Sequence, residues 1–372
     1  MNIALLPIEL IHFLMENLKS ERSSLHALTL TSKALRWEAT RFLYLSMTDA
    51  SGTTHYKFLS TIRKHPVELA PLVRIYHAPT NAHEQRGHLW GITRRCLPLM
   101  VNLKELAFHK IIGNPLQIFP TVCKGQKMPF QLDRFVWMVQ HPNHEKEMQT
   151  FLESQSELTH VQWPTSHCVV LQFPENACRK LTSFVGSTST IRTILPSRSI
   201  TELCWLNEWA SYRGSQSRFR HDPIEVFELK EFAALRGLSL GASVWDSVVS
   251  HPRFKGSSSL EVLEVSAIMD YNSGRLDKFD WMNLRNILRK FARLKKLVIT
   301  PSSPFTELVN MQDDVNMQDD LTSEIGQVLA QCLHLRYVDI LWDNDGIYRR
   351  WVDGEPLPNL LSIKRDRILK FE

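Results

Sequence analysis

The sequence predicts an α/β protein in which a small N-terminal three-helix unit precedes an irregular solenoid of strands and helices. Two observations predict this class. Residues 6–47 contain three short helix-like stretches that carry more apolar residues than so small a unit can bury. From residue 72 onward a six-residue pattern recurs, with helix-like segments in several intervals. We therefore place the helical unit at 5–47, a helical connector at 48–71 and the solenoid at 72–372.

The first predicted helix carries two apolar stripes instead of one. The stripes consist of Ile8, Ile11, Met15 and Leu18 on one side and of Leu10, Phe13 and Leu14 on the other. Pro7 suits the first helical position, and Glu9 suits the positive end of the helix dipole. One stripe can pack on the two helices that follow. The other lacks an evident partner within the unit, so we expect a partner chain or the next domain to cover it.

Two further helices complete the unit. Ser23 or Ser24 is the predicted cap of the second helix, whose apolar positions are Leu25, Leu28 and Leu30. The third helix spans about Lys33 to Tyr44, and the residues that its spacing buries are Leu35, Ala39, Phe42 and Leu43. Three short helices make a thin core, so the unit gains stability by docking on something larger.

The opening of the chain follows a known pattern. Leu6-Pro7-x-Glu9-Leu10 is followed by apolar residues at Leu14 and Leu18, by the run 31–35 and by the pair Leu43-Tyr44. In these features residues 5–47 resemble the F-box family, with Leu35 and Tyr44 in place of the commoner tryptophans. Residues 58–66 and 69–73 are similar to the connecting segment of fungal F-box proteins.

The resemblance implies a fold, a partner and a function. An F-box docks on the Skp adaptor of a cullin-type ubiquitin ligase, while the rest of the chain presents a protein substrate. By motif position, the residues that would contact the adaptor are Leu6, Pro7, Leu10 and Leu14. The alternative is an N-terminal helical cap that only closes the domain behind it.

The recurring pattern reads apolar–x–x–apolar–x–apolar. Its copies begin at Leu103, Leu132, Leu158, Leu181, Ile200, Leu235, Leu260, Leu294 and Leu335, and Leu72 begins a candidate first copy. The fourth and sixth positions point inward, as a short strand requires, and helix-like segments follow at 89–100, 147–155, 281–291 and 323–332. Such a chain resembles degenerate leucine-rich repeats. The Asn or Cys of strict repeats is absent, so we expect irregular curvature; an ordinary α/β domain is the alternative.

The strand phase also predicts a recognition surface. Residues between and after the inward pair point to the concave face, away from the helices. They are Arg74, Tyr76, Glu105, His109, Arg134, Met138, His160, Gln162, Lys296, Tyr337 and Asp339. This mixture suits a protein interface, although any single member can equally be a solvated strand residue. Trp137, Trp163 and Trp205 occupy the inward sixth position and are predicted core residues.

Composition narrows the function classes. No stretch approaches 18 apolar residues, and the N-terminus lacks the basic leader of a signal peptide, so we expect a cytoplasmic or nuclear protein that contacts no membrane. The net charge is +5, of which residues 301–372 contribute 7 − 13 = −6 and residues 1–300 therefore +11. The basic residues are dispersed, which argues against nucleic acid. The scattered cysteines predict reduced thiols, and the group His160, His167, Cys168 and Cys178 lacks the spacing of a metal site.

Two polar segments interrupt the repeat, and both are predicted loops: 209–223 and the duplicated tract 310–320 within an insert at 301–320. No nucleotide-binding loop, nucleophile elbow or metalloprotease motif occurs, so we expect no cofactor and no catalysis. The favoured hypothesis is a substrate-recognition subunit of a Skp–cullin–F-box ubiquitin ligase. The second is a scaffold that never meets a ligase, and the third is an enzyme with a site across the concave face.

Overall fold

The computed structural model describes residues 7–19, 21–48, 51–79, 86–109, 118–119, 127–138, 145–164, 173–206, 224–241, 244–245, 251, 256–266, 281–301, 317–343, 345–364 and 367–370. Helices and parallel strands alternate along most of this length, so the protein belongs to the α/β class. The chain divides into two compact units. Unit 1 comprises Met1–Val161 with Asn176–Arg179, and unit 2 comprises Gln162–Glu175 with Lys180–Glu372. The predicted loop 209–223 lies outside the described residues.

Three helices open unit 1: α1 (Ile8–Asn17), α2 (Arg22–Thr29) and α3 (Lys33–Leu45). Their shared core contains Ile11, Met15, Leu25, Leu35 and Ala39, with Leu18, Leu28, Phe42 and Leu43 packed at its margin. Arg22 fixes α2 to the end of α3, because its guanidinium donates to the carbonyls of Leu43 and Ser46 at 3.0 and 2.9 Å. The core is thus formed by one stripe of α1, as the spacing predicts.

Three local predictions for this region are wrong. Pro7 is the N-cap of α1 and not its first helical residue; its carbonyl accepts the first helical hydrogen bonds. Neither Ser23 nor Ser24 caps α2, which begins at Arg22, and the Ser24 hydroxyl instead donates to Glu21 at 3.0 Å. Leu30 follows the end of α2 and is exposed, since the helix stops before it can turn toward the core.

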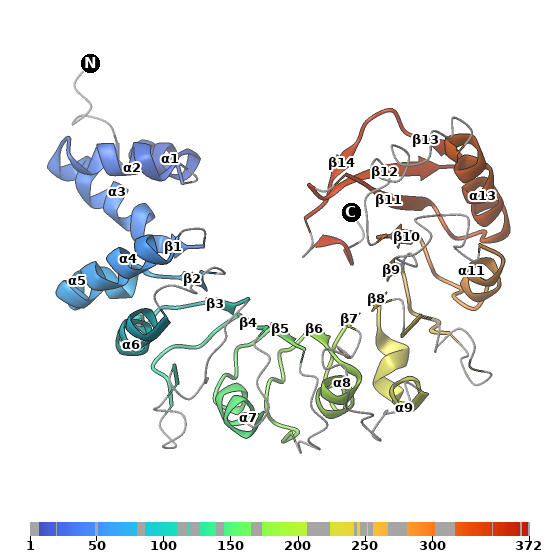
Figure 1. Ribbon diagram of the computed structural model, residues 1–372, viewed down its shortest axis with the longest axis horizontal. Helices are drawn as coiled ribbons and strands as arrows, with labels where there is room; N and C mark the ends of the chain where they lie inside the picture. Colours follow the sequence, from blue (N-terminus) through green and yellow to red (C-terminus); the bar gives the residue numbers. More distant parts are fainter. Residues whose placement is uncertain are drawn as a thin grey trace. The chain divides into compact units, whose positions relative to one another are not determined.

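The helical unit continues directly into a parallel ladder of strands. β1 (Ser46–Met47) follows α3 without a break and pairs with β2 (Ile75–Ala78), which pairs with β3 (Glu105–Phe108), which pairs with β4 (Arg134–Trp137). The helices of this ladder are α4 (Gly52–Lys64), α5 (Pro66–Leu69), α6 (Arg86–Cys96) and α7 (Glu145–Glu153), with 3₁₀ turns at Ala70–Leu72 and Leu97–Leu99. They lie on one side of the strands, and none of the described helices lies on the other side (Figure 1).

Unit 2 repeats the same construction. β6 (Ser183–Gly186), β7 (Glu202–Trp205), β8 (Gly237–Gly241), β9 (Val262–Ser266), β10 (Lys296–Ile299) and β11 (Tyr337–Asp343) pair in parallel in chain order. The helices α8 (Thr188–Ile194), α9 (Ile224–Phe227), α11 (Trp281–Leu288) and α13 (Met317–Gln331) lie on one side, as in Figure 1, with a 3₁₀ turn at Lys230–Ala234. β5 (His160–Trp163) crosses the unit boundary.

A C-terminal antiparallel addition closes unit 2. β12 (Ile347–Val352) turns back on β11 and also pairs with β13 (Glu355–Pro356) and β14 (Leu361–Ser362). The sequence pattern did not predict these strands. It was also wrong about the end of the acidic tract: helix α13 begins at Met317, where Asp319 lies in a first turn that favours negative charge. Residues 310–316 lie outside the described residues.

Each copy of the six-residue pattern from Leu103 onward forms a strand that begins at its third position. The first, fourth and sixth positions are buried on the helix side; in the copy at Leu132, for example, Leu132 and Phe135 are fully buried and Trp137 is nearly so. The predicted core tryptophans Trp137, Trp163 and Trp205 are confirmed, each at most 2% exposed. The pattern therefore fixes which side of each strand faces the helices.

Candidate functional site

The most exposed apolar surface of α1 is the predicted second stripe. Leu10, Phe13 and Leu14 are 53%, 66% and 43% exposed, and Pro7 is exposed on the same side of the helix. We call Pro7, Leu10, Phe13 and Leu14 the α1 patch. Ile8 shares the other stripe with the buried Ile11 and Met15, but it is the first residue of the helix and is itself exposed. Leu6 lies outside the described residues.

The opposite side of α1 is held by α3. The His12 ring lies 5.0 Å from the Phe42 ring, and its Nδ1 is 3.7 Å from a carboxylate oxygen of the buried Glu38. These contacts fix the rotation of α1 about its axis, because they and the buried residues Ile11 and Met15 face inward together. The α1 patch is therefore presented to solvent by a helix whose orientation is set.

A polar cluster lies on the helix-free side of the unit 1 ladder. Glu105 Oε1 accepts from His77 Nε2 at 2.8 Å and pairs with Arg134 Nε at 3.2 Å. The His77 and His109 rings meet edge to face at 5.9 Å. The Arg134 amide donates to the carbonyl of Lys104, just before β3, and the His160 amide donates to that of Asp133, just before β4. His160 therefore has the same position in its strand as Arg134 has in β4. We call His77, Glu105, His109, Arg134, Met138 and His160 the strand-face cluster.

Charge inside the cluster is balanced around one carboxylate. Burial alone would raise the pKa of Glu105, but the hydrogen bond from His77 and the charges of His77, Arg134 and His160 outweigh it and lower the pKa. Burial lowers the pKa of His109, and the positive charges of His77 and Arg134 act in the same direction. At neutral pH the cluster therefore holds an ionised Glu105 and a neutral His109.

One predicted member of this surface is on the wrong side. Tyr76 pairs with Leu106 in the ladder and is fully buried on the helix side, with its ring edge-on to His55 at 5.5 Å. The first copy of the pattern begins at Val73 and not at Leu72, and a slip of one residue moves every side chain to the other face. His77, which the sequence did not single out, takes the surface position instead. Arg74 is exposed at the strand edge, where it donates to the carbonyl of Asn102 at 3.1 Å.

In unit 2 two predicted recognition residues are buried. Asp339 is fully buried and Lys296 is 2% exposed, with Lys296 Nζ 3.6 Å from the Asp339 carboxylate. Arg350 of β12 donates two hydrogen bonds of 2.7 and 2.8 Å to the same carboxylate, and its guanidinium lies over the Tyr337 ring. The prediction that Lys296 and Asp339 bind a partner directly is wrong, because β12 and the C-terminal residues cover them. Tyr337 and Gln162 are half-buried.

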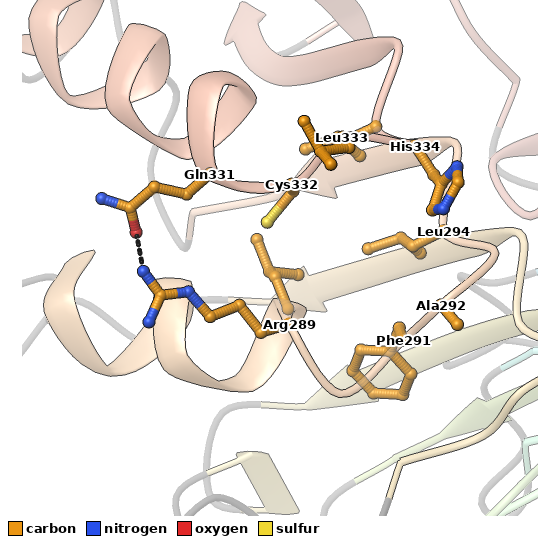
Figure 2. A pocket seen from close by; sticks show the side chains of 10 residues that line it. Arg289, Phe291, Ala292, Leu294, Gln331, Cys332, Leu333 and His334 are labelled. Carbon is orange, nitrogen blue, oxygen red and sulfur yellow. Dashed lines mark hydrogen bonds between the residues drawn. The ribbon is translucent and has the colours of Figure 1, made fainter.

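A pocket of about 250 Å³ opens on the helix side of unit 2, where the end of α11 meets the end of α13. Figure 2 shows Phe291, Leu294 and the Cys332 thiol at its wall, with Arg289 bonded to Gln331 at 3.0 Å along one side. Burial raises the pKa of Cys332, although the charge of Arg289 opposes this. A protonated thiol is a poor nucleophile, so the pocket offers no activated group.

The described residues also bear on three other features: metal sites, membrane-spanning helices and the state of the cysteines. No group of three or more His, Cys, Asp or Glu in the described segments is placed to hold a metal ion, and His167 and Cys168 fall outside these segments. None of the described helices has the length and apolar composition that a membrane crossing needs. The four described cysteines, Cys96, Cys178, Cys204 and Cys332, are in the thiol form and not in disulfides.

Comparison with known proteins adds no family assignment. No protein-family model matches the chain, and no curated protein matches it.

Proposed function

We propose that the protein is a substrate-recognition subunit of a Skp–cullin–F-box ubiquitin ligase. In this proposal the three N-terminal helices are a divergent F-box, and the two ladders are the parts of a leucine-rich-repeat-like solenoid. The α1 patch binds the Skp adaptor, with Pro7, Leu10 and Leu14 as the central contacts. The single observation that carries the proposal is the exposure of these three residues at the positions that the F-box motif assigns to the adaptor.

The physical argument is the cost of leaving the patch uncovered. Three large apolar side chains on one side of the short helix α1, those of Leu10, Phe13 and Leu14, are each more than two-fifths exposed. Burying an aliphatic side chain of this size stabilises a complex by about 1.5–3 kcal/mol. A contiguous apolar surface of this kind is typical of a protein interface and not of a free helix.

The strand-face cluster is the proposed substrate surface. It contains Arg134 and Met138, two residue types that are enriched at protein interfaces, together with three His side chains and Glu105, from β2–β5 and the residues directly after β3 and β4. The protein then acts by proximity. It raises the effective concentration of a substrate lysine near a charged conjugating enzyme and performs no bond chemistry itself.

Affinity purification from cells tests the assignment. The intact chain should retain a Skp adaptor and a cullin, and Leu10→Asp/Leu14→Asp should retain neither. Val67→Asp is the matched control, because Val67 of α5 is 85% exposed but lies outside the patch. Intact protein that carries neither ligase component contradicts the proposal and favours the second candidate, a scaffold whose helical cap serves another partner.

A further inference from the structure

The last described residues of the chain lie on the helix-free side of the unit 2 ladder, opposite α11 and α13 (Figure 1). We call residues 363–364 and 367–370 the C-terminal segment. Ile368 is 1% exposed and packs in one cluster with Val262 of β9, Val298 of β10 and Tyr348 of β12. Leu369 reaches β8, where a Cβ built on Gly237 would stand 3.0 Å from the Leu369 Cβ. The segment therefore crosses three parallel strands.

Lys296 supplies a polar contact with the segment, in addition to the hydrogen bond that the Ile363 amide donates to the Gly346 carbonyl at 3.1 Å. Lys296 Nζ lies 3.4 Å from the carbonyl oxygen of Ile368 and 3.4 Å from that of Lys370. Main-chain carbonyls are present in every peptide, so this contact selects a backbone and not a sequence. Selectivity comes from the aliphatic pair Ile368-Leu369, which fills the surface between Gly237, Val262 and Val298.

The surface does not depend on the segment for its own order. Val262 and Val298 belong to strands paired on both sides. Asp339 is held by two hydrogen bonds from Arg350, and it keeps a counter-charge beside Lys296 whether or not the segment is present. In the segment itself Ile368 is buried, Ile363 and Leu369 are half-buried against the same cluster, and Lys364, Arg367 and Lys370 are exposed. The surface is thus formed by paired strands, and the segment packs on it through three aliphatic side chains.

We propose that the helix-free face of β8–β10 is a peptide-binding surface whose resident occupant is the C-terminal segment, and that it accepts a partner segment with two adjacent aliphatic residues in its place. This surface is distinct from the strand-face cluster, and the proposal does not depend on the ligase assignment. Because the resident occupant is tethered, it competes at an effective concentration near the millimolar range, and a free peptide binds the intact chain more weakly.

Binding in trans tests the proposal. The probe is a fluorescent peptide of residues 361–372, and the matched control peptide carries Ile368→Asp and Leu369→Asp. A chain ending at Lys364 should bind the probe at least tenfold more tightly than the intact chain does, and the control peptide should not bind. The intact chain with Ile368→Asp should bind the probe as the shortened chain does. Equal binding of the two peptides, or no binding to a folded shortened chain, overturns the proposal.

Hydrogen exchange on the intact chain is the second test, and it does not require any variant to fold. The amides of Arg367 and Lys370 donate within the segment to Lys364 and Arg367 at 2.8 and 3.0 Å. If the segment detaches while the sheet stays folded, the amide hydrogens of Arg367 and Lys370 exchange at least tenfold faster than those of β9 and β10. Exchange at the same rate as those strands makes the segment part of the structural core and contradicts the proposal.

Discussion

At the scale of the residue, the buried imidazole of His55 in α4 links protonation to stability. It is fully buried, and neither ring nitrogen has a hydrogen-bond partner among the described residues. Burial, followed by the positive charges of Arg22 and His77, lowers the pKa of His55 from 6.5 to about 4. The unfolded chain therefore takes up this proton near pH 6.5, whereas the folded chain takes it up only near pH 4. The resulting contribution to stability is complete above pH 6.5 and is lost as the pH falls.

We predict that lowering the pH from 7 to 5 reduces the free energy of unfolding of the native chain by about 2 kcal/mol more than that of His55→Leu. Urea unfolding followed by circular dichroism at the two pH values measures the difference. His26→Leu, at an exposed position of α2, should keep the full loss. If His55→Leu loses as much stability as the native chain, the buried histidine is not the cause.

Asp339 is the second residue with a sharp consequence. It is the shared counter-ion of Lys296 and Arg350 in a buried setting. Its hydrogen bonds and charge raise the pKa of Arg350, so the guanidinium stays ionised. Removing the charge leaves two cations together on one strand face, and breaking such a buried group is strongly destabilising.

Asp339→Asn should therefore lower the free energy of unfolding by about 3 kcal/mol. Asp345→Asn removes the same charge at an exposed turn and should change stability little. Thermal unfolding of both variants beside the native chain provides the measurement. A loss of equal size in the two variants would show that net charge, and not the buried group, sets the effect.

At the scale of the element, two glycines of unit 2 occupy different backbone settings: one has a left-handed conformation, and the other lies within a helix. Gly256 has a φ of +77°, and a Cβ there would collide with the backbone carbonyl oxygen of Lys290. Gly326 lies within α13, where a Cβ meets no atom within 4 Å. The same substitution therefore has opposite consequences at the two positions.

Gly256→Ala should lower the stability of unit 2 by about 2 kcal/mol, because a left-handed backbone and a collision with main chain are both unfavourable. Gly326→Ala should raise it by roughly 0.5–1 kcal/mol through helix propensity. The denaturant midpoints of the two variants, compared with that of the native chain, measure both effects. A stabilising effect at Gly256 would mean that the chain there does not need the left-handed conformation.

The strands show how far the sequence predicts the elements. A buried Leu or Ile followed by alternating inward residues locates nine strands, because that spacing leaves no other face for the helix layer. The same rule slips by one residue at β2, since Leu72 matches the first four positions of the pattern through Ile75, and the pairing with β3 shows that the copy begins at Val73. The hairpin partner β12 gives no such signal, because its Arg349 and Arg350 interrupt the apolar alternation.

The candidate site was predictable to a similar degree. The exposure of Leu10 and Leu14 follows from counting apolar residues on one short helix. The burial of Lys296 and Asp339 does not, because the covering residues lie 11 to 74 positions later and carry no complementary pattern that a single chain reveals. Long-range coverage of this kind is a property of tertiary structure alone.

At the scale of the whole molecule, the function that we propose for the chain is binding. Residues 1–300 carry a net +11 and residues 301–372 a net −6, so a substrate that contacts the strand-face cluster meets the basic part of the sequence. The ligase assignment requires only that the α1 patch engage an adaptor while the ladders stay free to bind a target. Recruitment of a substrate to a ligase depends on that one contact.

The most direct test is a calorimetric titration of the purified protein with a purified Skp adaptor. We predict a dissociation constant in the micromolar range or tighter for the native chain and for Val67→Asp. Binding should be at least a hundredfold weaker for Leu10→Asp/Leu14→Asp, whose substitutions lie on an exposed surface and leave the helical core intact. A native chain that does not bind, or a double variant that binds as the native chain does, would contradict the central claim.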